Sequence, residues 1–122
     1  MERTWFVLGS LSALIAVAAG AFGAHVLQGH ITDDSLVNWD TAARYQMYHA
    51  LALLLVAWAA GRWPVPAVSA AGWLFVAGTV LFAGSLYVMS LSGIRWLGAI
   101  TPLGGLAFIG GWLCLAWSGW KG

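Results

Sequence analysis

Residues 65–90 read VPAVSAAGWLFVAGTVLFAGSLYVMS and contain no Asp, Glu, Lys or Arg. A helix that crosses a bilayer needs about 20 mainly apolar residues, because each residue advances the chain by about 1.5 Å and the hydrocarbon layer is about 30 Å thick. Lipid offers no partner to a free backbone amide, so the crossing segment must be a helix that satisfies its own hydrogen bonds. Residues 65–90 therefore predict a transmembrane helix.

Further apolar blocks of similar length lie on both sides of this stretch. They lack the alternation of apolar and polar residues that is typical of barrel strands. The sequence therefore predicts an all-α membrane protein, a four-transmembrane-helix bundle with short loops. We expect residues 1–122 to form a single transmembrane domain, with spans at about residues 5–26, 41–61, 65–90 and 96–118.

The composition agrees with a protein solvated by lipid. Only 7% of the 122 residues are charged and 61% are hydrophobic, whereas about a quarter of the residues of an ordinary globular protein are charged. The mean hydropathy is +0.85. The formal net charge of +1 provides no basic surface that could neutralise a row of phosphates. We therefore expect the lipid bilayer as a partner and no nucleic acid.

Local signals place the ends of the helices. Asp40 is a candidate N-cap for the second span, Pro66 restarts the chain before the third, and Gly93 follows the end of the third. The only long connection covers residues 27–39. Within it, Thr32 predicts the cap of a short separate surface helix.

The charged residues indicate an orientation. An even number of spans puts both termini on one side of the membrane. The side of the termini carries Arg3, Arg62 and Lys121, and the other side carries Arg44 and Arg95 with all the aspartates. Because cytoplasmic loops carry an excess of Lys and Arg, this distribution predicts cytoplasmic N- and C-termini.

Tryptophans near the ends of the spans are interpreted mostly as interface anchors. One interface would hold Trp5, Trp63, Trp117 and Trp120, and the other Trp39 and Trp96.

Small residues recur at helical spacing and predict close helix packing, because backbones can approach where side chains are small. The candidate packing residues are Gly20, Gly23, Ala24, Gly84, Gly104, Ala107 and Gly111. Packing within one chain is the simpler interpretation. A face that binds a second subunit is the alternative.

Polar residues inside the spans are costly and mark candidate functional positions. Counting along the four spans brings these residues to one outer layer, whereas the cytoplasmic half is apolar. We therefore predict a single polar cluster that locks the helices or forms a shallow site open to the outer face. Its candidate members are His25, Tyr45, Gln46, His49, Ser85, Tyr87 and Thr101.

Four motifs in order along the chain carry a resemblance to a known family. They are GAFGAH at 20–25, W39 with TA at 41–42, YQ at 45–46 and H49, FAGSLY at 82–87, and TPLGG at 101–105 with GW at 111–112. Together they resemble the YgdD/YwdK-type family of small bacterial membrane proteins, a domain of unknown function with similar small transmembrane proteins in eukaryotes. The resemblance implies four spans and the bacterial plasma (inner) membrane. It implies no reaction, substrate or cofactor.

The residues themselves predict neither an enzyme nor a bound cofactor. No GxSxG motif is present, and no carboxylate inside a span could orient a histidine. A haem or metal ion on His25 and His49 is the alternative, although no third ligand has suitable spacing.

Two functions remain open. The first is a structural or accessory subunit that stabilises a membrane complex, with a membrane-protein partner or a homo-oligomer. The alternative is a protein that binds or conducts a small solute, protons or a lipophilic molecule.

Overall fold

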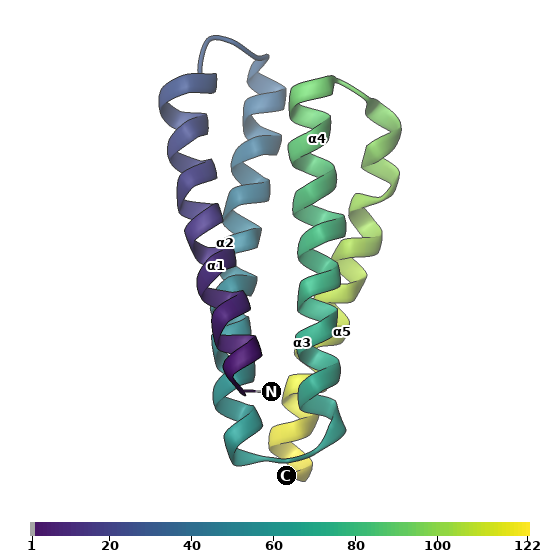
Figure 1. Ribbon diagram of the computed structural model, residues 1–122. Helices are drawn as coiled ribbons and strands as arrows, with labels where there is room; N and C mark the ends of the chain where they lie inside the picture. Colours follow the sequence, from purple (N-terminus) through teal and green to yellow (C-terminus); the bar gives the residue numbers. More distant parts are fainter. Residues whose placement is uncertain (1) are drawn as a thin grey trace.

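The chain folds into an all-helical bundle in the computed structural model, which describes residues 2–122 and contains no strand among them (Figure 1). Four helical rods follow one another. The rods consist of α1 (Glu2–Phe22) with η1 (Gly23–Leu27); α2 (Asp33–Arg62); α3 (Pro66–Gly78) with η2 (Thr79–Ala83) and α4 (Gly84–Ser92); and η3 (Arg95–Ala99) with α5 (Thr101–Lys121). The predicted all-α class is therefore confirmed.

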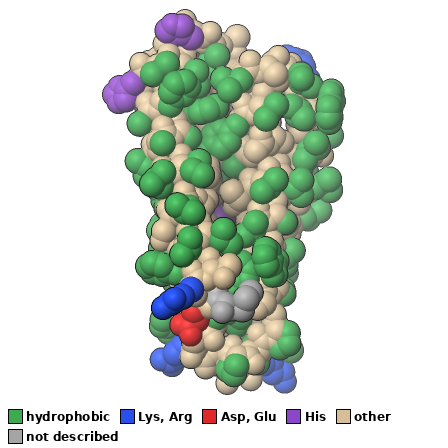
Figure 2. Space-filling model, viewed as in Figure 1, with side chains coloured by type: hydrophobic (Ala, Val, Ile, Leu, Met, Phe, Trp, Pro, Cys, Tyr) green, Lys and Arg blue, Asp and Glu red, His purple; other side chains and the backbone are tan. Residues whose placement is uncertain are grey.

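Three of the rods are long and apolar enough to cross a membrane: Glu2–Leu27, Pro66–Ser92 and Arg95–Lys121. The remaining rod, α2, is 30 residues long but carries several charged and polar residues in its first half. Figure 2 shows hydrophobic side chains over the middle of the visible face, with charged side chains toward its two ends. Such a surface suits a hydrocarbon layer between two polar layers.

The rods pack as two neighbouring pairs. The first rod lies along α2, and α3 lies along α5, while α4 contacts α2 and joins the pairs. Figure 1 shows both termini toward one end of the bundle, near the connection at 63–65. We call this the termini end. The opposite end, with the connections at 28–32 and 93–94, is the loop end.

The start of α2 differs from the prediction. Thr32 is the N-cap, and its Oγ1 accepts a hydrogen bond from the backbone N–H of Ser35 at 3.1 Å. The helix then continues through Asp40, so the predicted surface helix and second span are one element. The prediction that Asp40 is an N-cap is wrong, because its carboxylate instead pairs with Arg44 one turn further along α2.

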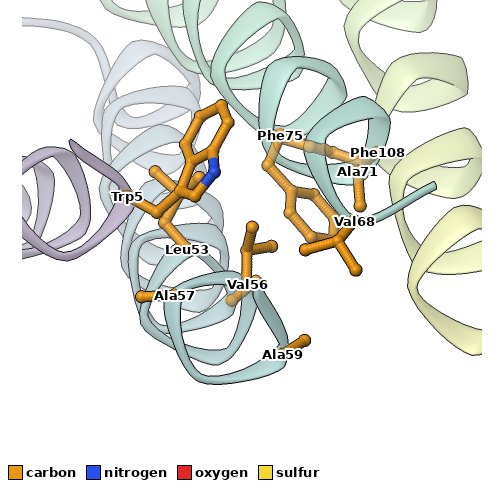
Figure 3. Close-up of a cluster of buried hydrophobic side chains, with 10 residues drawn as sticks. Trp5, Leu53, Val56, Ala57, Ala59, Val68, Ala71, Phe75 and Phe108 are labelled. Carbon is orange, nitrogen blue, oxygen red and sulfur yellow. The ribbon is translucent and has the colours of Figure 1, made fainter. Parts of the chain in front are cut away.

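A hydrophobic core fills the termini end (Figure 3). The interpretation of Trp5 as an interface anchor is wrong, because its side chain is 0% exposed and lies inside this core. Its ring occupies the space beside Gly72, where a Cβ would lie 2.6 Å from Trp5 Cη2. Val56 and Phe75 are also fully buried in this core.

Trp39 is a second buried tryptophan that was expected at an interface. It is 8% exposed and packs on Gly23, where a Cβ would lie 2.5 Å from Trp39 Cδ1. Its indole N–H donates to the backbone oxygen of Ala19 at 2.7 Å. By contrast, Trp96 and Trp120 are largely exposed, as interface anchors would be.

The small residues divide into packed and open positions. Gly111 packs on Phe75, whose Cε1 would lie 2.6 Å from an added Cβ, and Gly104 lies directly against the backbone of Phe82. A Cβ on Gly20 or Gly84 would meet nothing within 4 Å.

Two alanines complete the predicted packing set. Ala24 is exposed, whereas Ala107 is half-buried. Close packing therefore involves Gly23, Gly104 and Gly111, and the expectation does not hold for Gly20, Ala24 and Gly84. Gly9 and Gly72 are tightly packed positions that the prediction missed.

Candidate functional site

The middle of α2 directs two polar side chains into the bundle. Gln46 and His49 are three residues apart and therefore share a face of the helix. Each is 5% exposed. A buried polar group requires a hydrogen-bond partner, and both residues find theirs on other helices.

Gln46 joins three rods. Its side-chain N–H group donates to Ser12 on α1, with distances of 3.2 Å to Oγ and 3.3 Å to the backbone oxygen. Its Oε1 accepts a hydrogen bond from the Tyr87 hydroxyl on α4 at 2.7 Å. The Tyr87 ring in turn packs edge-on against Trp39, with ring centroids 4.6 Å apart. Gln46 therefore connects α2 to α1 and to α4.

His49 connects α2 to α5. The indole N–H of Trp112 donates to its Nε2 at 3.1 Å, and its Nδ1 lies 2.8 Å from the backbone oxygen of Tyr45. The imidazole also stacks on Phe108, with centroids 3.5 Å apart and an interplanar angle of 5°.

These partners determine the tautomer of His49. An indole nitrogen can only donate and a carbonyl oxygen can only accept, so Nε2 must be the acceptor and Nδ1 must carry the proton. The neutral imidazole therefore uses both of its nitrogens within the protein. Protonation at Nε2 would place two donors against each other and break the contact with Trp112.

Ser85 and Thr101 form a third contact between helices. Their hydroxyl oxygens are 2.6 Å apart, and Ser85 also donates to the backbone oxygen of Phe82 at 3.0 Å. This pair connects α4 to the start of α5.

The predicted single cluster is thus replaced by three separate contacts. Gln46 meets Tyr87, and Ser85 meets Thr101. The partner of His49 on another helix, Trp112, lies outside the predicted set. This corrects the expectation for His25, which lies exposed in η1 with no hydrogen bond to the others in the described part of the chain.

Tyr45 contacts His49 and Phe82 through its ring and its backbone oxygen rather than through its hydroxyl. The ring is 4.9 Å from that of Phe82 and lies nearly parallel to the imidazole of His49.

A metal ion or haem would have to compete with these contacts. Each nitrogen of His49 already has a protein partner, so iron or zinc would have to displace Trp112 or the carbonyl of Tyr45. Within residues 2–122, no group of three His, Cys, Asp or Glu side chains could hold a metal ion.

Sequence reasoning missed two of the polar partners. The predicted cluster contains neither Ser12 nor Trp112, although Trp112 belongs to one of the four motifs. The available signal was the requirement that buried Gln46 and His49 each find a partner. That requirement does not identify the partner, because several polar groups lie at a similar depth.

The fold and these contacts define an all-helical bundle with three rods apolar enough to cross a membrane, in which Gln46, His49 and Ser85 join neighbouring helices. A family model described as "Protein of unknown function (DUF423)" matches residues 19–105. The chain is 51% identical over 114 residues to the UPF0382 membrane protein YwdK of Bacillus subtilis, with 93% of each chain covered. It is 50% identical over 113 residues to the UPF0382 membrane protein SAB0533 of Staphylococcus aureus, covering 93% of this chain and 92% of that one.

The chain belongs to this family of membrane proteins of unknown function, and the resemblance to its YwdK-type members is confirmed. No solved structure matches the chain significantly.

Proposed function

We propose that this chain is a four-span protein of the bacterial plasma membrane that serves as a structural or accessory subunit and stabilises a membrane complex. The observation that supports this role is the pairing of the polar groups within the bundle. Gln46, His49 and Ser85 all bond to protein groups on neighbouring helices. Side chains paired in this way hold helices together, and they do not converge on an open space where a substrate would bind.

The path of the chain supports α2 as the fourth span. The first rod ends at the loop end, and the third rod begins at the termini end (Figure 1). If both cross the membrane, residues 28–65 must bring the chain back across the same thickness. At about 1.5 Å per residue, the 30 residues of α2 reach about 45 Å, more than the hydrocarbon layer requires.

The central polar residues of α2 are compatible with a membrane span, because they face the interior of the bundle. In this helix, Gln46 and His49 face inward, whereas Leu51, Leu55 and Trp58 are about half exposed. The surface that this helix would present to lipid is therefore apolar along its second half. A mean hydropathy calculated over α2 includes these inward polar groups, although they do not contact lipid.

The orientation proposal rests on charge. Arg3, Arg62 and Lys121 belong to the termini end, which agrees with cytoplasmic termini under the positive-inside rule.

Purification from native membranes in a mild detergent tests the accessory role. We expect a membrane protein to co-purify in a fixed ratio, and to be lost when exposed apolar residues such as Leu14 and Leu106 are replaced by bulkier Trp. Recovery of the chain alone, or only with a tightly bound small molecule, would favour the alternative of a solute-binding or permeation protein.

A further inference from the structure

A cavity of about 470 Å³ opens at the loop end between the first rod and the start of α2. The contacts of Gln46, His49 and Ser85 lie outside its wall. Trp39 and Gly23, which pack on each other, both line it. Its volume lies within the range of about 300 to 1,000 Å³ that is typical of small-molecule sites. The cavity is therefore large enough for a ligand and separate from the three polar contacts described above.

The cavity is amphipathic. One part of its wall is apolar and includes Gly20, Ala24 and Trp39, and the other part carries the side chains of Asp33 and Arg44. The space is open down to the backbone at Gly20, because a Cβ there would meet nothing within 4 Å. A ligand with an apolar chain and one polar end would match both parts.

The charges on the cavity wall favour a ligand whose polar end is cationic. Asp40 and Arg44 form an ion pair, which uses the only positive charge that lines the cavity. Asp33 has no Lys, Arg or His within ion-pair distance among residues 2–122, so no basic side chain neutralises its carboxylate. Trp39 also lines the cavity, with only 8% of the residue exposed.

We propose that this cavity binds the ammonium group of an amphiphile, with the cation at Asp33 and the apolar chain along Ala24. Two sources share this chemistry: an aminophospholipid of the bilayer and a free aliphatic amine. The proposal rests on the four-span topology only for the depth of the cavity, which would lie at the level of the lipid headgroups. Binding to the purified protein can therefore be measured whether or not that topology holds.

Asp33 also has a purely structural interpretation, because a carboxylate in the first turn favours the helix dipole. Asp34 occupies the same turn but does not line the cavity. Asp33→Asn and Asp34→Asn are therefore a matched pair. Similarly, Gly20→Leu would fill the cavity, whereas Gly84→Leu adds the same side chain at an open position elsewhere.

The test uses the full chain in a nonionic detergent. Native mass spectrometry would measure bound phosphatidylethanolamine against phosphatidylglycerol with identical acyl chains, and calorimetry would compare octylamine with octanol. We expect Asp33→Asn to lower the phosphatidylethanolamine preference and the octylamine affinity about 3-fold, the order expected for loss of one exposed ion pair. Asp34→Asn and Gly84→Leu should leave both unchanged, and Gly20→Leu should reduce both.

Each outcome decides the proposal. If Asp33→Asn weakens the binding of both phosphatidylethanolamine and octylamine, the proposal is supported with a bilayer lipid as the ligand. If it weakens only octylamine binding, the proposal is supported with a free amine as the ligand. Equal effects of Asp33→Asn and Asp34→Asn, or equal binding of octanol and octylamine, would overturn it. Circular dichroism identifies any variant that fails to fold. If Gly20→Leu fails to fold, the comparison of Asp33→Asn with Asp34→Asn decides the question.

Discussion

The indole nitrogen of Trp112 and the Nε2 atom of His49 are 3.1 Å apart and form a hydrogen bond between α5 and α2. These two helices share few other contacts, because α5 packs mainly on α3 and η2. The bond therefore ties the fourth rod to the second across the bundle. Together with the stacking of His49 on Phe108, it gives α2 a defined rotation relative to α5.

Replacement of Trp112 by Phe should destabilise the protein by about 1 kcal/mol. The change keeps an aromatic ring but leaves buried Nε2 of His49 without a donor, and hydrogen bonds between membrane helices have about this value. Trp117→Phe is the control, because Trp117 lies on the same helix and is about half exposed. Unfolding by SDS in mixed micelles measures both, and equal curves for the two variants would show that the bond contributes nothing.

Removal of the Tyr87 hydroxyl should weaken the contact of α4 with α2. Tyr87→Phe leaves Oε1 of Gln46 without its partner at 2.7 Å, so we expect a loss of about 1 kcal/mol of unfolding free energy. Tyr45→Phe removes a hydroxyl from a ring that packs on Phe82, and should cost less. A double-mutant cycle with Gln46→Leu measures the coupling. A coupling near zero would contradict the assignment of this bond.

Enlargement of Gly111 should destabilise the bundle through overpacking. A side chain at this position would meet the ring of Phe75, so Gly111→Leu is expected to cost about 1 to 3 kcal/mol. Gly105→Leu, on the same helix, meets nothing within 4 Å and should be neutral or slightly stabilising, because glycine is a poor helix former. Thermal unfolding in detergent compares them. A similar melting temperature for both variants would show that the Gly111 face is not closely packed.

The sequence predicted the helices well because lipid leaves the backbone few choices. Apolar length and the absence of backbone partners in lipid are properties of each segment by itself. The errors arose where the decisive contact lies on another helix. Trp5 and Trp39 were assigned to interfaces from their positions along the chain. They are buried because Gly72 and Gly23 on neighbouring rods leave room for their rings.

The polar contacts could be predicted only in part for a related reason. Residue counting gives the depth of a side chain along the helix axis, but not the rotation of the helix about that axis. It therefore indicated Gln46 and His49 as buried groups without identifying Ser12 and Trp112 as their partners. His25 was included for its depth, although the rotation of η1 leaves it exposed.

The most direct test of the proposed architecture asks whether α2 crosses the membrane. In a Cys114→Ser background, single cysteines would replace His30 and Pro64, exposed residues beyond the two ends of α2. We predict that a membrane-impermeant maleimide reaches His30→Cys from outside the plasma membrane, and reaches Pro64→Cys only after the membrane is opened. The reverse pattern would overturn the proposal that both termini are cytoplasmic, but not the proposal that α2 crosses the membrane. Labelling of both positions from the same side would contradict the four-span bundle.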